Sequence, residues 1–311
     1  IVYRVRLGNP ETTQPFINEG LKVPRGIAAH AGILYVADSG AGRVAAFNEK
    51  DGSPAGEIKV KEPRYVGVDP KTGAVYVSAA KGSRSDLIKF ASLESGKEVA
   101  RISIPSLKER NKLGDVGARL AVCRKDDVVK IWIPGGGRRG EGLLVPIVDK
   151  GSSLVMMAKP DEISTAKKKK RKKGGAKTEG GDEEAPDAGR VGYGIKNLWV
   201  DRRRDELYIN RNRFDERTCE FKGEVVGPFG SGLQLVPDSK GNLLAASMGK
   251  KNAGLSRWTR DGKPLPWEGA KDNSSKPTGI MDMVMSFTHE VLGPWRDEVY
   301  VVVTANWRGP Q

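Results

Sequence analysis

The chain has 311 residues, and its 39 glycines, 18 prolines and 6% aromatic content are typical of many short strands joined by turns rather than of a helical bundle. It contains no run of roughly 18 apolar residues, the length that a membrane span needs, so we expect no membrane-crossing segment. The formal net charge of +14 indicates that an acidic partner fits this protein better than a basic one.

Residues 1–17, IVYRVRLGNPETTQPFI, are predicted to form a strand, a turn and a second strand. They include neither an initiator methionine nor a basic and then apolar leader. We therefore expect a processed or excised chain with a secreted or periplasmic location. The repeats that follow have four strands each, so these two strands form only half of a repeat. They can complete a repeat that ends after two strands at the other end of the chain.

The next segment, PRGIAAHAGILYVADSGAGRVAAFNEKDGSPAGEI from residue 24, contains four short apolar strands separated by HAG, DSGAG and EKDGS. Clusters of this kind are turn formers, so the segment predicts one four-stranded antiparallel sheet. Residues 63–102 repeat the pattern in register, with YVGVD matching GIAAH and AVYVSA matching ILYVAD. The chain is therefore a repeat array.

Later copies are looser. A third begins at residue 118 with ARLAVCRKDDVVKIWI, and a fourth with the strands of 195–210. Between them, residues 160–190 are predicted to be a disordered charged insert because their composition cannot bury a core. The window 161–190 has nine Lys or Arg against seven Asp or Glu, so the other 281 residues keep a net charge of +12. The basic character therefore belongs to the folded part.

A fifth copy is predicted at 233–247, and a sixth at 279–303, where the chain ends after two strands. The two strands of 1–17 complete this last sheet. We therefore predict an all-β fold, a six-bladed β-propeller of four-stranded antiparallel blades, whose ring closes when the N-terminal outer strands pair with the C-terminal inner strands. Such closure removes the open sheet edges that promote aggregation.

Residues 24–52, with the pattern P-x-G-I-A, G-x-L-Y-V-A-D-S-G, R-V, F and D-G, resemble the NHL repeat. Ala41 stands where that repeat usually has Asn. The resemblance implies a single NHL-like β-propeller over residues 1–311. It also implies two distinct faces. The top face carries the connections from second to third strands and from one blade to the next, and is the usual ligand face. The bottom face carries the other turns.

The two histidines, His30 and His289, are predicted to lie in turns of the bottom face. A histidine metal site of the kind that the resemblance brings from peptide-amidating lyases is therefore disfavoured. Cys123 and Cys219 are predicted to be two buried thiols, with one bridge between them as the alternative. No cofactor is expected.

Polar residues of the inner strands are predicted to line a wet central channel; they are Arg64, Arg119, Asn197, Gln234 and Asp282. Propellers of the gluconolactonase type hold a divalent cation with oxygen ligands from these strands. One carboxylate beside two guanidinium groups makes a poor cation site, so no metal is predicted. A metal-dependent hydrolase or lyase of this type stays the alternative function.

Asp38 and Arg43 flank the turn DSGAG, and the structural role is favoured for Asp38, which is expected to accept hydrogen bonds from the turn's own N–H groups. The turns between second and third strands are predicted to carry eleven cations against five anions, whereas the bottom turns carry a net charge of −2. The predicted ligand-binding residues are Arg43, Lys81, Arg84, Arg138, Arg139, Arg211, Arg213, Arg217, Lys250, Lys251, Asn306 and Arg308.

This charge distribution favours a non-enzymatic binding or scaffold protein over an enzyme. Its basic top face would engage an acidic protein or polysaccharide by long-range attraction. Nucleic acid is the weaker alternative. Base stacking needs aromatic side chains, and the predicted top turns offer only three of them, Phe214, Trp307 and Tyr193.

Overall fold

The computed structural model describes residues 1–6, 14–81, 84–104, 120–135, 143–157, 198–201, 204–209, 212–216, 221–225, 234–238, 240–247, 254–266, 274–275, 288–295 and 298–303. Their regular structure is all β-strand, and the strands form six four-stranded antiparallel sheets. No helix among the described residues has the length and apolar character that crossing a membrane requires.

The first two sheets follow the two clearest sequence repeats. One contains β3 (Pro24–His30), β4 (Ile33–Asp38), β5 (Arg43–Asn48) and β6 (Pro54–Lys59). The next contains β7 (Pro63–Val68), β8 (Val75–Lys81), β9 (Arg84–Phe90) and β10 (Glu98–Ile104). The strand boundaries agree closely with the predicted ones, because Gly-rich and Asp-rich turns separate β-branched runs here.

Three further sheets have the same up-and-down order. They contain β11 (Ala121–Lys125), β12 (Val128–Gly135), β13 (Leu143–Asp149) and β14 (Leu154–Met156); β15 (Leu198–Asp201), β16 (Glu206–Ile209), β17 (Asn212–Asp215) and β18 (Phe221–Glu224); and β19 (Gln234–Pro237), β20 (Leu243–Ser247), β21 (Gly254–Trp258) and β22 (Ser274–Ser275). The predicted insert at 160–190 lies outside the described residues.

The remaining sheet combines both ends of the chain. It contains β1 (Val2–Arg6) and β2 (Gln14–Ile17) together with β23 (Thr288–Trp295) and β24 (Glu298–Val303), in the order β2-β1-β24-β23. β1 runs antiparallel to β24, with Val2 opposite Val302 and Arg6 opposite Glu298. The predicted pairing of the N-terminal strands with the C-terminal strands is thus present in the structure.

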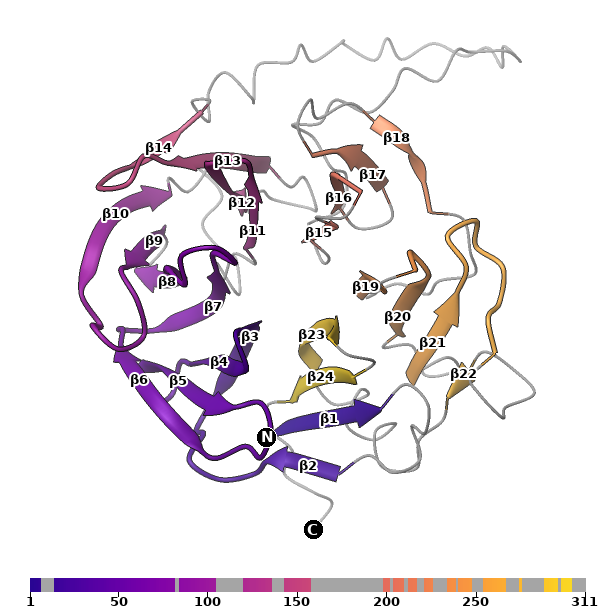
Figure 1. The fold of residues 1–311 in the computed structure, drawn as a ribbon, viewed down its shortest axis with the longest axis horizontal. Helices are drawn as coiled ribbons and strands as arrows, with labels where there is room; N and C mark the ends of the chain where they lie inside the picture. Colours follow the sequence, from indigo (N-terminus) through magenta and orange to yellow (C-terminus); the bar gives the residue numbers. More distant parts are fainter. Residues whose placement is uncertain are drawn as a thin grey trace, which may run out of the picture.

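The sheets stand around a central axis, each with one strand at the axis and one at the rim (Figure 1). This arrangement is that of a β-propeller. The inner strands are β3, β7, β11, β15, β19 and β23, and each contacts its neighbour around the axis. Within each sheet the chain runs up and down, so the top and bottom faces follow from the strand order.

The hydrophobic core lies between neighbouring sheets rather than at the axis. One buried cluster joins the sheet of β3–β6 to that of β7–β10, and a second continues from there to the sheet of β11–β14. Val2 and Ile17 pack onto Leu34 and Phe47, which joins the sheet of both chain ends to the first repeat. The first two of these sheets are therefore buried on both faces, which explains the nearly continuous apolar runs of β4 and β8.

One strand prediction is wrong. His289 was predicted to lie in a turn of the bottom face, but it lies inside β23, the inner strand of the sheet that combines both ends of the chain. Pro294 and Gly293 disfavour a strand in the sequence. The pairing of β23 with β24 shifts register between Leu292 and Trp295, and this irregularity accommodates both residues.

Candidate binding surface

Asp38 ends β4 on the top face and is fully buried. Its Oδ1 accepts a hydrogen bond from the Val23 N–H at 2.7 Å, and its Oδ2 accepts one from the Lys22 N–H at 2.9 Å. Ser39 supports the same segment by donating its N–H to the Val23 carbonyl at 3.0 Å. Asp38 thus has a structural role, as predicted, but the predicted hydrogen-bond donors are wrong. The Asp38 carboxylate accepts hydrogen bonds from the segment that leads into β3 and not from the N–H groups of its own turn.

Arg43 lies directly opposite Asp38, as the first residue of β5. Its Nη1 donates to Glu57 Oε2 at 2.5 Å, and its Nη2 donates to the Gly20 carbonyl at 2.5 Å. Because Glu57 is a carboxylate, the charge of Arg43 is balanced within the sheet.

Lys81 ends β8 and is largely exposed, with its Nζ 3.6 Å from Asp86 Oδ2. Asp86 is buried and also accepts hydrogen bonds from Arg101 at 3.0 Å and from Ser103 at 2.6 Å. Burial raises the pKa of Asp86, but the hydrogen bonds from Ser103 and Arg101 outweigh it and lower that pKa overall. The carboxylate is thus kept charged beside Lys81.

Arg213 does not lie in a top turn as predicted, because β17 begins at Asn212 and Arg213 is the second residue of this strand. Arg217 lies outside the described residues. The Arg213 Nη1 lies 3.6 Å from Glu206 Oε1, at the bottom end of β16. The polar strand NRFD resembles a loop, which is why the sequence misplaced the turn.

The remaining predicted ligand-binding side chains lie outside the described residues; they belong to Arg84, Arg138, Arg139, Arg211, Lys250, Lys251, Asn306 and Arg308. The same holds for four predicted channel side chains, those of Arg119, Asn197, Gln234 and Asp282, although the backbone of Gln234 begins β19. Arg64 is described: it is the second residue of β7 and is half-buried.

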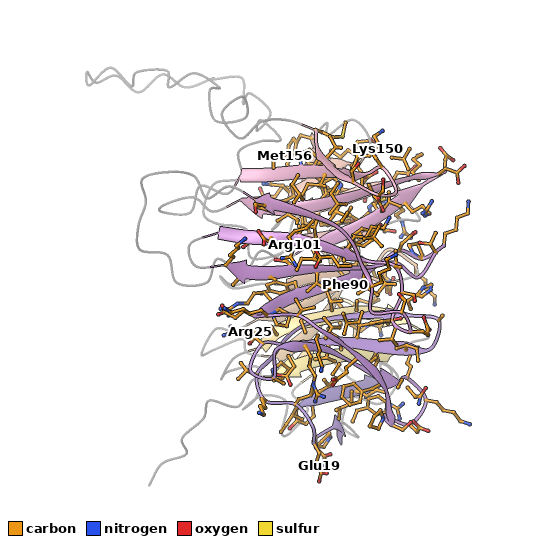
Figure 2. The ribbon with its side chains drawn as sticks, turned by 90° about the vertical axis from the view of Figure 1, so that its left-hand side faces the viewer. Glu19, Arg25, Phe90, Arg101, Lys150 and Met156 are labelled. Carbon is orange, nitrogen blue, oxygen red and sulfur yellow. The ribbon has the colours of Figure 1, made fainter. Side chains whose placement is uncertain are left out.

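Arg25 is a residue that the sequence analysis missed. It is the second residue of β3, the position that Arg64 occupies in β7, and Figure 2 shows it at the end of the molecule that also carries Met156. Lys150, which follows β13 on the bottom face, lies further to the right in the same view, in which the top face is on the left. The repeated dipeptide Pro-Arg at 24–25 and 63–64 was the available signal.

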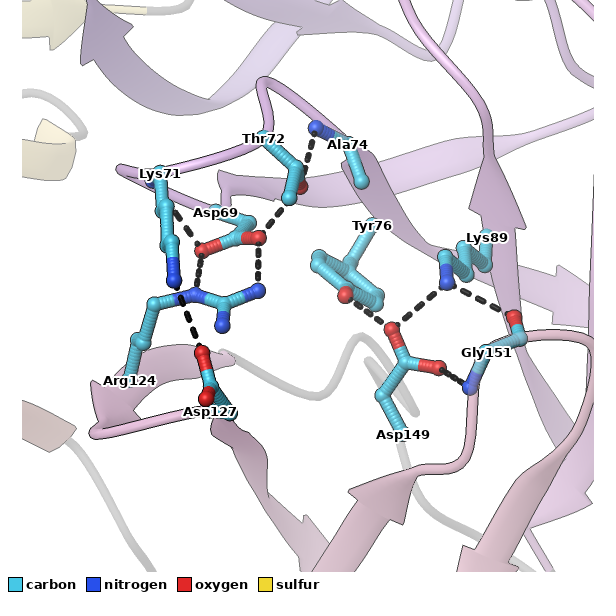
Figure 3. A network of polar contacts seen from close by, with 10 residues as sticks. All are labelled: Asp69, Lys71, Thr72, Ala74, Tyr76, Lys89, Arg124, Asp127, Asp149 and Gly151. Atoms are coloured by element: carbon cyan, nitrogen blue, oxygen red, sulfur yellow. Dashed lines mark hydrogen bonds and ion pairs between the residues drawn. The ribbon is translucent and has the colours of Figure 1, made fainter.

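The bottom face is held together by polar contacts between sheets (Figure 3). Arg124 on β11 donates its Nε to Asp69 Oδ1 at 2.6 Å and its Nη2 to Asp69 Oδ2 at 2.5 Å. Thr72 also donates to this buried carboxylate. Burial raises the pKa of Asp69, but the hydrogen bonds from Arg124 and Thr72 outweigh it and lower that pKa to about 2.

A second contact between the same two sheets centres on Asp149, at the end of β13. It accepts a hydrogen bond from the buried Tyr76 hydroxyl at 2.5 Å and pairs with Lys89 Nζ at 2.7 Å (Figure 3). The Gly151 N–H donates to the other oxygen at 2.7 Å. Burial raises the pKa of Tyr76, and the bond to Asp149 raises it further, so the phenol stays a donor.

Equivalent contacts join the next pair of sheets. The Trp132 Nε1 on β12 donates to Glu216 Oε1 at 2.9 Å, and Lys130 lies 3.3 Å from the same oxygen. Lys125 pairs with Asp205 across this junction. The described charges of the bottom face therefore act mainly on one another.

Within the part of the chain that the structure describes, no group of three or more His, Cys, Asp or Glu residues could hold a metal ion. Cys123 is buried and packs with Ala121 and Trp132, whereas Cys219 lies outside the described residues. The described part of the candidate surface consists of four cations at or near strand ends of the top face, Arg25, Arg43, Arg64 and Lys81.

These sheets define the class of the protein as a β-propeller. No family model matches the chain, and no curated protein matches it. Among solved structures, the chain is similar to a gluconolactonase from Xanthomonas campestris, with 13% identity over 85% of this chain and 80% of that chain and a TM-score of 0.45.

It is also similar to the β-propeller domain of Cps50 (Swd1) from Myceliophteria thermophila, with 12% identity, 93% and 86% coverage and a TM-score of 0.48. A chain of a nidogen/laminin complex matches with 10% identity, 83% and 88% coverage and a TM-score of 0.48. At such identities these likenesses carry no functional information.

Proposed function

We propose that this protein is a non-enzymatic binding propeller whose top face engages an acidic partner. The observation that carries the proposal is the charge of the segments that connect the strands. The top-face segments are the parts of the sequence between second and third strands and between one sheet and the next, together with the residues after β24. Counted between the strand bounds of the structure, they hold 24 Lys or Arg and 13 Asp or Glu. The bottom-face segments hold 13 and 15. The net charges are therefore +11 and −2.

The Lys-rich run is not the source of this difference. Without residues 157–197, the top-face segments still hold 13 cations and 6 anions, a net charge of +7. The ion pairs of the bottom face also support the proposal, because they use opposite charges to join neighbouring sheets. A one-sided positive field attracts polyanions and orients their approach, with a reach of roughly 8 Å at physiological salt.

The partner that fits best is an acidic protein or polysaccharide. We also propose the finer form of the fold: six blades in one closed ring of the NHL type. The pairing of β1 with β24 and the contacts of β23 with β3 support closure. The gluconolactonase-type alternative depends on Asp282 and Asn197, which lie outside the described residues, and no specific observation favours it.

The test is binding of fluorescein-labelled poly-glutamate to the full chain. We expect reversal of four cations that the sequence predicts for the top face, in Arg138→Glu, Arg139→Glu, Lys250→Glu and Lys251→Glu together, to weaken binding at least tenfold. The matched control reverses four bottom-face lysines, Lys71, Lys97, Lys150 and Lys240, and should change the dissociation constant less than threefold. Equal losses in the two variants would contradict the proposal, as would binding that does not weaken with salt.

A further inference from the structure

The strands β1 and β2 complete a sheet whose other two strands lie near the far end of the sequence. We call residues 1–17 the N-terminal hairpin; its strands lie outside β24, towards the rim (Figure 1). The other five described sheets each consist of four strands that follow one another in the chain. The pairing of β1 with β24, from Val2 opposite Val302 to Arg6 opposite Glu298, therefore has no connecting turn. It can separate while the other described strand pairings stay intact.

The N-terminal hairpin also packs on the first repeat. Val2 and Ile17 are buried in one cluster with Leu34. The Arg4 Nη1 donates to the Glu49 carbonyl oxygen at 3.3 Å. These contacts depend on the sequence of the hairpin and not on its covalent link to β3. The same hairpin of a second copy can therefore make them equally well.

Residues 18–23 connect the N-terminal hairpin to β3, and the end of β4 holds the last part of this connection. The buried Asp38 carboxylate accepts the N–H groups of Lys22 and Val23 at 2.9 and 2.7 Å. Ser39 donates both its N–H and its hydroxyl to the Val23 carbonyl oxygen, each at 3.0 Å. Four hydrogen bonds thus fix the two residues that lead into β3.

Arg43 holds the middle of the same connection. Its Nη2 donates to the Gly20 carbonyl oxygen at 2.5 Å, while its Nη1 pairs with Glu57. Gly20 has a φ of +75°, which residues other than glycine rarely adopt, so the path of the connection is specific. We call Asp38, Ser39 and Arg43 the latch. Its hydrogen bonds require the compact connection, because an extended one moves these backbone groups away.

We propose that the latch keeps the N-terminal hairpin in its own ring, and that release of the latch lets the hairpin close the ring of a second copy of this chain. In the exchanged dimer each hairpin makes the contacts with its partner that it makes in the monomer. The free-energy difference between the two forms therefore lies mainly in the connection, where the latch acts. This inference goes beyond the proposed function and does not depend on it.

A second copy fits the vacated position better than an unrelated strand does. Separation of the hairpin leaves the edge of β24 unpaired, and an unpaired edge is a template for another strand. The position takes a strand of five residues and an apolar side chain at each of the places of Val2 and Ile17. A second copy carries these features in its own hairpin. Reciprocal exchange also leaves neither copy with a free edge.

The connection lies where exchange meets no obstacle from the ring. Asn18, Glu19 and Gly20 are exposed, and Figure 2 shows Glu19 at the outer edge of the molecule. A released hairpin can therefore leave outwards. Six extended residues reach about 20 Å. The exchanged dimer would thus join its two rings rim to rim.

The test measures molar mass by size-exclusion chromatography with light scattering. The full chain is first warmed to just below its melting temperature and cooled at high concentration. The latch variant, Asp38→Ala with Arg43→Ala, lacks three hydrogen bonds of the compact connection. We expect its ratio of dimer to monomer to exceed that of the wild type roughly tenfold or more, because losing these bonds destabilises the monomer and not the exchanged dimer.

The matched control, Lys89→Ala with Asp149→Ala, also removes a carboxylate and its cation, but at the junction between the second and third sheets. It lowers the stability of the ring without changing the connection. We expect its ratio of dimer to monomer to stay within roughly twofold of the wild type. Equal dimer formation by the control and the latch variant would contradict the latch, because low stability alone would then explain exchange.

Disulfide crosslinking shows whether the hairpin itself is exchanged. Val2→Cys and Val302→Cys are placed in the latch variant together with Cys123→Ala and Cys219→Ala, because Val2 and Val302 lie opposite each other. Oxidation of an exchanged dimer links two chains, so a dimer band on a non-reducing gel supports the proposal. A dimer peak that yields only internally linked monomers would contradict it.

Thermal unfolding shows whether each variant is folded. A latch variant that folds and stays monomeric at every concentration would overturn the proposal. If the double variant does not fold, Arg43→Ala decides instead, because it leaves the buried Asp38 in place. This variant should raise the ratio of dimer to monomer by roughly threefold. An unchanged ratio would speak against the latch.

Discussion

Buried carboxylates of this propeller lie at strand ends, where backbone N–H groups or side chains of the next sheet reach them. Asp38 accepts two backbone N–H groups, and Asp69 accepts both arms of Arg124. The hydrogen bonds from Arg124 and Thr72 favour the ionised form of Asp69 and lower its pKa. Ionisation of Asp69 therefore contributes to folding stability.

The pKa of Asp69 predicts an acid-sensitive contribution to stability. Its folded pKa of about 2 lies below the ordinary value of 3.8, so the contribution is fully present above about pH 4 and is lost as the pH falls towards 2. We expect Asp69→Asn to lower the free energy of unfolding by about 2 kcal/mol at pH 7, with the difference shrinking between pH 4 and 2. Urea unfolding across this range measures it, and a difference that is constant with pH would contradict the assignment.

The role of Asp38 could be predicted from the sequence because Asp beside a Gly-rich turn has few other functions. Its donors, Lys22 and Val23, could not, since they belong to a connection without a recognisable motif. Pairs such as Lys125 and Asp205 are 80 positions apart, and nothing in a single sequence identifies such partners.

At the scale of strands and sheets, the inner strands approach one another through glycine. A Cβ atom at Gly67 on β7 would meet Leu120 Cδ1 at 2.5 Å and Val122 Cγ2 at 2.6 Å. The second and third sheets can therefore pack closely only while this residue lacks a side chain.

We expect Gly67→Ala to destabilise the protein by about 1–3 kcal/mol, because the added methyl group overpacks the junction between β7 and β11. The double variant Gly67→Ala with Leu120→Ala should recover part of the loss relative to the sum of the single variants. Denaturant unfolding of the four proteins gives the coupling energy. Strictly additive effects would show that the two positions do not compete for space.

The sequence predicted these elements best where turn chemistry and apolar runs agree, as in β3 to β10. The strand prediction failed at β23, because its proline and glycine are residues that disfavour a strand. It also failed at β17, because its polar residues are typical of a loop. The basic character proposed for the top face rests on composition and strand order. Arg25 and Arg64 are the second residues of two inner strands, and the sequence analysis predicted an inner-strand position only for Arg64.

For the whole molecule, the sheet that joins β1 and β2 to β23 and β24 links the two ends of the chain. Removal of residues 1–17 would expose the edge of β24 and remove Val2 and Ile17 from their buried cluster with Leu34. Both effects weaken the packing of the neighbouring sheet.

We therefore expect the chain without residues 1–17 to melt at least 8 °C lower, and a synthetic peptide of residues 1–17 to restore much of the loss when added in excess. Calorimetry with and without the peptide measures this. The control peptide carries Val2→Asp and Ile17→Asp and should not restore it. An unchanged melting temperature after truncation would contradict a closing role for these strands.

This pairing also sets an order of events during synthesis. β1 and β2 leave the ribosome before the other described strands, yet β24, the strand beside β1, is made nearly 300 residues later. At roughly 5–20 residues per second, the early hairpin waits many seconds without its sheet partner. During that interval Val2 and Ile17 can pack only on the first repeat. The propeller reaches its native form only after nearly all of the chain has been translated.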